Sequence, residues 1–236
     1  LAGCVQPALA PRINAAAARV LDRNGVSLVE APGVGCCGAL RYHLNDQEGG
    51  RDDMRRVIDA WWPMVERGEV EAIVMTASGC GSFVREYHHH FQEDPAYRDK
   101  AKRISAMTRD LSEVVPEKGL GRTGKPLRVA FQSPCSLQHG QQLRGKVEAL
   151  LRAAGCELTP VAEGHLCCGS AGTYSILQPE LSGQLRERKL VALAAGGAAG
   201  GPECIATANI GCLAHLQGGT PTPVRHWIEL LDARSA

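Results

Sequence analysis

The sequence predicts an α/β fold built from two tandem, pseudo-symmetric modules, each with a small, mostly parallel sheet and flanking helices. Three observations support this prediction. The 236 residues are too many for one minimal core and fit two domains of ordinary size. One pattern of cysteines occurs twice along the chain. Strand-like and helix-like segments alternate around both copies of that pattern, which is typical of α/β proteins.

The repeated pattern is a lone cysteine, a pair of adjacent cysteines followed by glycine, and a last cysteine. The first set is Cys4, Cys36, Cys37 and Cys80, and the second set is Cys135, Cys167, Cys168 and Cys212. Corresponding members lie 131 residues apart, except for the last cysteines, which lie 132 apart. The even spacing indicates that the two halves of the chain are copies of one another.

Eight thiols in two four-sulfur patterns predict two sites for a soft metal. Thiolates bind zinc tetrahedrally and also hold iron–sulfur clusters, so both remain open. Disulfides are a third alternative, but dense disulfides belong mostly to small secreted domains without a large core. Adjacent cysteines also rarely bond to each other, because the small ring distorts the peptide between them. We expect an iron–sulfur cluster in at least one half, with zinc open for the other.

The first half alternates helix-like and strand-like segments. We expect a helix over 9–24 that ends at Gly25, a strand over 27–30, an amphipathic helix over 50–68, a strand over 72–76, and helices over 82–91 and 96–115. The run 72–76 is continuously apolar, which suits a parallel strand that is covered on both faces.

The second half restarts the same scheme after a segment rich in proline, glycine and charge. This segment, 116–126, predicts a linker between a first domain of residues 1–115 and a second of residues 127–236. We then expect strands over 127–132, 157–161 and 204–208 and helices over 141–154 and 178–195. Residues 196–201 consist of glycine and alanine and predict a flexible connection. They do not predict a phosphate loop, because they lack its Lys-Ser/Thr. Each half therefore reads as a Rossmann-like module.

The lone and the last cysteine of each set follow strand-like runs and precede helix-like ones. In an open parallel sheet, ligands gather beyond the carboxyl ends of the strands. We therefore expect each set to converge on a crevice at the edge of its own sheet, where helix amino termini favour an anionic group. Gly38 and Gly169, directly after the pairs, would allow a close backbone approach or a positive φ.

Composition and charge exclude several classes of function. A net charge of +1 and 4% aromatic residues give no basic patch or stacking platform for nucleic acid. Apolar residues make up 44% and charged residues 22%, as in globular proteins. No stretch approaches the roughly 18 apolar residues that a membrane span needs. A site cysteine four residues from an end without methionine suggests an excised part of a longer protein.

These patterns resemble the CCG domain, the cysteine-rich module of heterodisulfide reductase and of several respiratory iron–sulfur subunits. The resemblance covers the whole chain as two copies. Five segments are similar to the iron–sulfur subunits of glycolate oxidases: Gly-Cys-Val-Gln-Pro at 3–7, Ser-Gly-Cys-Gly at 78–81, Ser-Pro-Cys at 133–135, Asn-Ile-Gly-Cys at 209–212 and Pro-Val-Arg-His-Trp-Ile-Glu-Leu-Leu at 223–231.

The resemblance implies an iron–sulfur electron-transfer subunit of a membrane-associated glycolate (2-hydroxy acid) oxidase or dehydrogenase. All eight cysteines of the two sets would bind [4Fe–4S] clusters, one or two in this segment. An FAD-containing subunit would oxidise glycolate, and electrons would move on toward the membrane quinone pool. A ferredoxin-like domain with two further clusters would precede these residues. The complex would be cytoplasmic and peripherally associated with the inner face of the cell membrane.

One departure from the family pattern bears on the chemistry. The heterodisulfide reductase pattern ends in Cys-x-x-Cys, and its fifth thiol supports a noncubane cluster. Phe83 and His215 stand at that place in the two halves. Electron transfer, with no catalytic residue in this chain, therefore fits better than cluster chemistry on thiols or disulfides. Two alternatives remain: a heterodisulfide-reductase-like cluster enzyme that acts on thiols or disulfides, and a zinc-stabilised docking scaffold.

The remaining reactive residues have simpler interpretations. Cys156 and Cys204 have no counterparts in the first half and are predicted to be buried structural residues. The charged run 186–189 and the histidines 88–90 predict ordinary solvent-exposed helix faces.

Four further histidines lie near the cysteine motifs: His43, His139, His165 and His215. The first three could donate a hydrogen bond to a cluster sulfur, although a partly exposed polar residue is the favoured interpretation. His215 lies about a turn beyond Cys212 and is a candidate for ligation or proton coupling.

Overall fold

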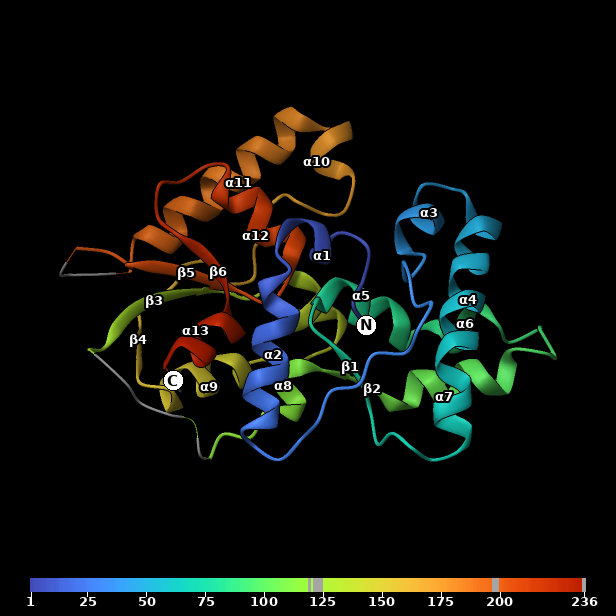
Figure 1. Ribbon diagram of the computed structural model, residues 1–236. Helices are drawn as coiled ribbons and strands as arrows, with labels where there is room; N and C mark the ends of the chain where they lie inside the picture. The colour runs from blue at the N-terminus through green and yellow to red at the C-terminus, as the bar shows by residue number, and fades with distance from the viewer. Residues whose placement is uncertain (119, 121–124, 197–199, 235–236) are drawn as a thin grey trace.

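The structure is a computed structural model that describes residues 1–118, 120, 125–196 and 200–234. It confirms the α/β class, with two small parallel sheets flanked by helices (Figure 1). The linker prediction at 116–126 and the flexible connection at 196–201 lie partly outside the described residues.

The first half contains short helices around two short strands. Its elements are α1 Gln6–Leu9, α2 Arg12–Asp22, α3 Ala39–His43, α4 Gln47–Glu66, β1 Ile73–Met75, α5 Ser78–Arg85, α6 Tyr87–His90, α7 Arg98–Met107, β2 Thr108–Asp110 and α8 Leu111–Val114. The long helix α4 begins after Asp46, whose side chain accepts a hydrogen bond from the Gly49 N–H at 3.1 Å. This is the N-cap contact that fixes where a helix starts.

The second half repeats this order with a larger sheet. Its elements are β3 Leu127–Gln132, the π-helix η1 Ser136–Gly140, α9 Lys146–Ala153, β4 Cys156–Leu158, α10 Tyr174–Leu177, α11 Pro179–Ala194, β5 Cys204–Thr207, α12 Ile210–Gln217, β6 Val224–His226 and α13 Trp227–Arg234.

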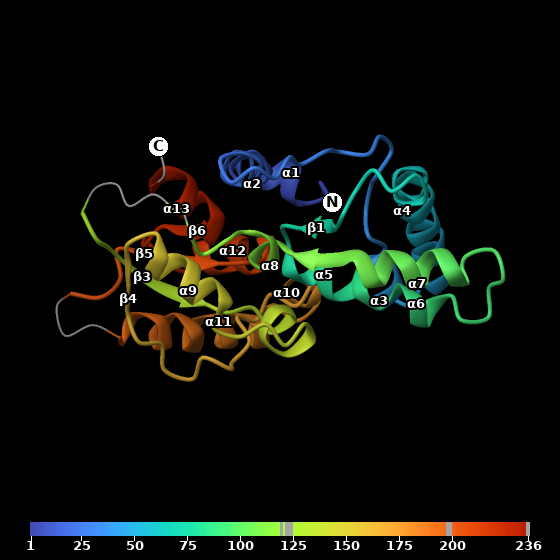
Figure 2. The same cartoon turned by 90° about the horizontal axis from the view of Figure 1, so that it is seen from below.

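Every strand pairing in the described residues is parallel. β1 pairs with β2, and the second sheet has the order β4-β3-β5-β6. Figure 2 shows α11 on one face of the second sheet and α13 on the other. The central strand β5 is buried along its whole length, as expected for a parallel strand that is covered on both faces.

The two halves pack against each other through reciprocal contacts. α2 of the first half lies against α13 of the second, and α9 of the second half lies against α8 of the first. In addition, α1 contacts α12, and η1 contacts α5. One hydrophobic core accordingly joins Ile13 and Leu21 of α2 to Trp227 and Leu231 of α13. The division into domains at 1–115 and 127–236 stays a prediction, but this core extends across it.

Several predicted elements differ from the structure. The strand over 27–30 is wrong, because those residues pair with no other strand. The helix over 96–115 is confirmed over α7 and wrong as a single helix, because β2 interrupts it and pairs with β1. Asp110 explains the break: its side chain accepts from the Ser112 N–H, while Glu113 accepts from the Asp110 N–H, so a new helix starts there.

Smaller differences concern element ends. The predicted helix over 9–24 is divided into α1 and α2, and that over 82–91 into α5 and α6. The helix over 141–154 begins only at Lys146, after Gly145 takes a φ of +75°. Strand β6 and helix α13, at the end of the second sheet, are additions that the sequence patterns did not predict.

Candidate metal centres

The structure brings the four cysteines of the first set together. Cys4 lies two residues before α1, the pair lies in the loop before α3, and Cys80 lies in the first turn of α5. The Sγ atoms of Cys4 and Cys36 are 3.5 Å apart. Cys36 interacts with Cys37, and Cys37 with Cys80, strongly enough to shift the pKa values of these thiols, so the four thiols lie in one group.

The second set has the same arrangement. Cys135 directly precedes η1, the pair lies in the loop before α10, and Cys212 lies in the first turn of α12. Interactions of Cys135 with Cys167, of Cys167 with Cys168, and of Cys168 with Cys212 shift the pKa values of these thiols. All eight cysteines singled out in the sequence therefore fall into two groups of four, although their role as ligands stays a prediction.

Parallel strands and helix starts position three of these thiols as expected, whereas the strand expected before Cys4 is wrong, because residues 1–3 form no strand. Cys80, Cys135 and Cys212 follow the carboxyl ends of β1, β3 and β5, respectively. In the first half, the Leu1 amino group lies next to β1 and donates to the Val74 carbonyl at 2.9 Å. Cys80 and Cys212 are each the third residue of an eight-residue helix, where free N–H groups and the helix dipole stabilise a thiolate.

The glycine after each cysteine pair is needed for two reasons. Gly38 has a φ of +86° and Gly169 a φ of +93°, which confirms the predicted positive φ. A Cβ at Gly38 would lie 2.5 Å from the Gly50 carbonyl oxygen, and a Cβ at Gly169 would lie 2.4 Å from the Ser182 carbonyl oxygen. The close approach is thus to the backbone of α4 and α11, which packs the loop tightly against the helix.

These glycines also direct N–H groups at sulfur. The Gly38 N–H donates to Cys36 Sγ at 3.4 Å, and the Gly169 N–H donates to Cys167 Sγ at 3.3 Å. Hydrogen bonds of this kind stabilise negative charge on a ligating sulfur.

In each set the last thiol is favoured as a thiolate, and in the second set the interaction with Cys135 also lowers the pKa of Cys167. The hydrogen bond from Cys37 lowers the pKa of Cys80, and the hydrogen bond from Cys168 lowers the pKa of Cys212. Hydrogen bonds to Cys167 and Cys212, together with burial, raise the pKa of Cys168. In the first set, burial raises the pKa of Cys4. Binding a metal would therefore release protons from the thiols of both sets.

The donor sets suit a thiophilic metal or cluster. The ten cysteines are all free thiols, and each set offers four sulfurs. As they stand, the sulfurs contact one another, and no three Cys, His, Asp or Glu side chains among the described residues form a group ready to hold a metal ion. A bound metal would have to replace the sulfur–sulfur contacts.

Aromatic side chains surround the first set. The Tyr87 hydroxyl donates to the Cys37 carbonyl at 2.7 Å, and the Tyr87 side chain is fully buried. Phe83, on the same helix as Cys80, packs its ring against Tyr87 at a centroid distance of 5.9 Å. The rings of Tyr42 and His43, just beyond the cysteine pair, also lie against Phe83.

Polar side chains surround the second set. Ser182 Oγ donates to the Gly169 carbonyl at 2.8 Å and lies 3.1 Å from His215 Nε2. Asn209 Nδ2 donates to Cys212 Sγ at 3.7 Å. Lys189 is fully buried, and its Nζ donates to the carbonyls of residues 163 and 164, just before the cysteine pair.

Asn209 also connects the two sites. Its Oδ1 accepts a hydrogen bond from the Gly79 N–H at 3.2 Å, next to Cys80, while its Nδ2 contacts Cys212. A second link joins Ser78 Oγ to Ser136 Oγ at 2.9 Å, next to Cys135. The two sites therefore face each other across the interface between the halves.

The other predicted residues have mixed outcomes. Cys156 and Cys204 are buried in the core, which confirms their predicted burial. His215 contacts Ser182 rather than a cysteine sulfur. His139 contacts the His165 carbonyl at 3.4 Å.

Sequence reasoning missed two residues of the second site. The prediction of a solvent-exposed charged face at 186–189 is wrong for Lys189, which has no exposed surface. A signal was available in the repeat of 131 residues. Lys189 corresponds to Ile58, an apolar core residue of the first half, so its position was expected to be buried. Asn209 gave no such signal, because its two contacts depend on how the halves pack.

Comparison with known proteins places these sites in a family. The model of the CCG cysteine-rich domain matches residues 1–85 and 129–217. The glycolate oxidase iron–sulfur subunit of Escherichia coli K12 is 50% identical over 98% of this chain and 56% of that protein. A probable glycolate oxidase iron–sulfur subunit of Bacillus subtilis 168 is 30% identical over 92% of this chain and 48% of that protein. The chain thus spans about half the length of these two relatives.

A shorter relative is matched over nearly its whole length. Lactate utilization protein A of Bacillus licheniformis is 27% identical over 98% of this chain and 97% of that protein.

Proposed function

The chain belongs to the CCG cysteine-rich domain family, and from this premise we propose that it is the electron-transferring iron–sulfur part of a glycolate (2-hydroxy acid) oxidase or dehydrogenase. The observation that carries the proposal is the pair of four-cysteine groups. Each is continuous and is supported by a helix start and a glycine N–H donor.

Each group would hold one [4Fe–4S] cluster through its four thiolates. Cys4, Cys36, Cys37 and Cys80 would bind the first cluster, and Cys135, Cys167, Cys168 and Cys212 the second. A bound cluster supplies a one-electron carrier. The chain's own contribution is to exclude water with the buried Cys37 and Cys168 and to donate N–H groups to sulfur.

With all four thiols used as ligands, no fifth cysteine is left beside either site. Phe83 and His215 lie one helical turn beyond Cys80 and Cys212, where a further thiol would be needed. This favours outer-sphere electron transfer over cluster chemistry on disulfides. Glycolate itself would be oxidised at the flavin of an FAD-containing partner subunit.

The partners and location follow from the same resemblance. Electrons would arrive from the flavoprotein, through a ferredoxin-like domain, and continue toward membrane quinone. No helix in the described ranges has the length and apolar character that crossing a bilayer requires. We propose that the complex associates with the inner face of the cell membrane through its surface or through a partner.

Metal analysis tests this proposal directly. Protein purified without oxygen, or reconstituted with iron and sulfide, is expected to contain about eight iron and eight sulfide per chain for two [4Fe–4S] clusters. Reduction should produce an EPR signal. A chain that binds no iron in either half under these conditions would refute the proposal.

A zinc-stabilised scaffold is the second candidate, and one distance favours it. A tetrahedral zinc site with Zn–S bonds of about 2.3 Å has sulfur–sulfur separations of roughly 3.8 Å. The Cys4–Cys36 separation of 3.5 Å is close to this value. Zinc without sulfide in the anaerobic protein would select this candidate for the first site.

A further inference from the structure

The second cysteine site has a buried lysine that has no counterpart on the equivalent helix of the first site. Lys189 lies on α11 with no exposed surface, and its Nζ donates to the Glu163 carbonyl at 3.3 Å and to the Gly164 carbonyl at 3.1 Å. Both carbonyls belong to the loop that leads to Cys167 and Cys168. A buried ammonium is retained in a fold only where hydrogen bonds or an opposite charge compensate it.

The opposite charge at Lys189 comes from the cysteines. Its neighbour Arg188 pairs with Glu163 at the surface, but in the described part of the chain no carboxylate pairs with Lys189 itself. Burial lowers the pKa of Lys189, while charge interactions with the four thiols of the second set oppose that lowering. An anionic group held by those thiols would therefore keep Lys189 protonated.

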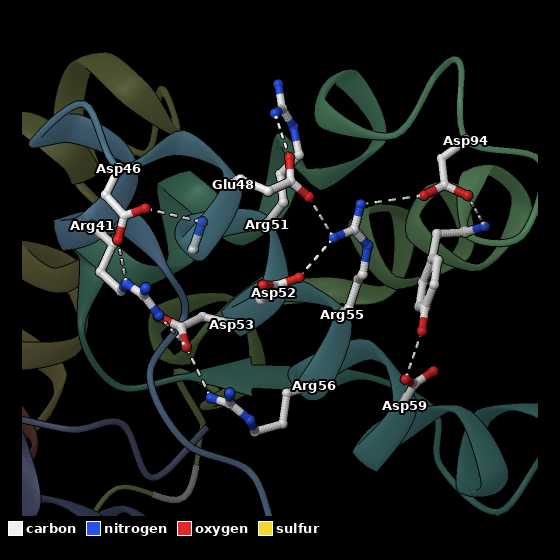
Figure 3. A network of polar contacts seen from close by, with 12 residues as sticks. Arg41, Asp46, Glu48, Arg51, Asp52, Asp53, Arg55, Arg56, Asp59 and Asp94 are labelled. Carbon is white, nitrogen blue, oxygen red and sulfur yellow. Dashed lines mark hydrogen bonds and ion pairs between the residues drawn. The ribbon is translucent and has the colours of Figure 1, made fainter.

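The first site has no equivalent charge among the described residues of α4. The position 131 residues before Lys189 is Ile58, which is fully buried in an apolar core on α4. The arginines of α4 are instead each paired with carboxylates (Figure 3). Arg55, for example, contacts both Glu48 and Asp52 at 2.8 Å. Paired surface charges contribute little field at a buried site.

The uncharged neighbours also make the second site the more polar of the two. Asn209 donates to Cys212 Sγ, whereas the glycine-flanked Cys80 has the aromatic ring of Phe83 one turn beyond it. His215 takes the place of Phe83 in the second site and joins Ser182. Hydrogen bonds and positive charge near ligating sulfurs raise the reduction potential of the bound group.

We propose that Lys189 is a charge-compensating residue that makes the group at the second four-cysteine site the more readily reduced of the two. This inference rests on the proposed function, since it requires a redox-active cluster at each site. Reduction adds one electron to a cluster, and the Lys189 ammonium stabilises that added negative charge in a medium of low dielectric. At the first site Ile58 stands at the equivalent position on α4, and burial lowers the pKa of the Leu1 amino group, the cation that interacts with Cys80.

The order of the potentials can be measured one site at a time. Cys80→Ser leaves the second site complete, and Cys212→Ser leaves the first. Both variants are reconstituted with iron and sulfide and titrated potentiometrically, with the EPR signal of the reduced cluster as the readout. We expect the Cys80→Ser protein to have the higher potential by at least about 59 mV, a tenfold change in a one-electron equilibrium. Equal or reversed potentials would overturn the inference.

Variants at Lys189 then identify the cause. In the Cys80→Ser background, Lys189→Met should lower the potential of the remaining cluster by about the same tenfold factor. Lys189→Gln should also lower it, because glutamine retains a hydrogen-bond donor but removes the charge. Arg188→Met, which removes an exposed and paired cation from the adjacent position, should leave the potential unchanged.

Each outcome decides between explanations. A Gln variant with the wild-type potential would show that hydrogen bonding alone matters and would overturn the charge role. A shift in Arg188→Met as large as that in Lys189→Met would do the same. If Lys189→Met binds no iron, the inference is tested by the potentials of the Cys80→Ser and Cys212→Ser proteins alone. Absence of iron from the otherwise unaltered chain refutes the proposed function itself rather than this inference.

Discussion

The two cysteine sites are built from equivalent elements but lie among different neighbours. In both, a lone cysteine precedes a short helix, a pair precedes a glycine of positive φ, and a last cysteine begins an eight-residue helix. Around the first site are aromatic rings, whereas a lysine, a histidine and a serine lie near the second. The repeat thus keeps the thiol geometry in both halves, while the surroundings that tune a bound group differ.

The glycines after the pairs give the largest effect on stability that this comparison predicts. Gly38→Ala and Gly169→Ala each place a Cβ against a helix carbonyl oxygen and force a left-handed backbone on alanine. We expect each to cost about 3 kcal/mol of unfolding free energy and to weaken iron binding at its own site. Urea unfolding and iron content measure both effects.

Gly33→Ala is the matched control. Gly33 also has a positive φ, of +81°, but a Cβ there would meet no atom within 4 Å. Gly33→Ala should therefore lose only about 1 kcal/mol of unfolding free energy, which is what a left-handed backbone costs an alanine. A cost equal to that of Gly169→Ala would show that the helix contact is unimportant.

A second contrast concerns the buried ends of β2 and β6. His226 is fully buried, and this burial lowers its pKa to about 4. Between about pH 6.5 and 4 the unfolded chain therefore takes up a proton that the folded chain does not, so stability falls as the pH falls. The loss should approach roughly 3 kcal/mol near pH 4 and be absent in His226→Gln, as measured by urea unfolding at each pH.

Asp110 at the end of β2 predicts the opposite dependence. Burial raises the pKa of Asp110, so its contribution to stability is lost as the pH rises above the unfolded value of about 3.9. The stability of Asp110→Asn relative to the parent should therefore increase from acidic to neutral pH. Unfolding curves between about pH 4 and 8 with parallel profiles for variant and parent would contradict the assignment.

Contacts between the halves are expected to have a smaller effect. Asn209→Ala removes the acceptor for the Gly79 N–H and the donor to Cys212, at a cost of about 1–2 kcal/mol. Ser136→Ala removes only the contact with Ser78 and should cost about 1 kcal/mol. If the Asn209 variant loses no more stability than the Ser136 variant, its bridging role is not supported.

The surface ion pairs between α2 and α13 should contribute least. Hydrogen bonding from Arg19 lowers the pKa of Asp232, which also contacts Arg23 at 2.7 Å. Asp232→Asn is expected to cost about 0.5 kcal/mol, because the arginines are exposed and screened. The difference should begin to shrink as the pH falls toward the unfolded pKa of about 3.9 and disappear only below the lowered pKa of Asp232, where the folded carboxylate is also protonated. A difference that stays the same from neutral to acidic pH and at high salt would point to packing instead of charge.

The sequence was most informative where local rules and the repeat agree. Apolar runs predict strands β1, β3 and β5, and their carboxyl ends place Cys80, Cys135 and Cys212 as the parallel-sheet rule requires. The break at β2 could have been recognised from the capping pair Asp110 and Glu113. A three-residue strand within helix-like periodicity is otherwise hard to detect.

The missed features depend on contacts between distant segments. The strand expected at 27–30 has suitable residues but no partner strand. Lys189 resembles its charged neighbours in the sequence, and only packing against the loop at 163–164 shows that it is buried. The reciprocal packing of α2 on α13 and of α9 on α8 likewise depends on the relation between the halves, which no local pattern encodes.

Iron and sulfide stoichiometry of two single-cysteine variants tests the central claim that each four-cysteine set is a separate iron–sulfur site. Cys80→Ser and Cys212→Ser, prepared anaerobically, should each retain about half of the parent's iron and sulfide, and Cys204→Ser, altered at a core thiol, should retain all of it. Loss of all the iron in either site variant would mean one shared centre, and full retention in both would mean that these thiols are not the ligands.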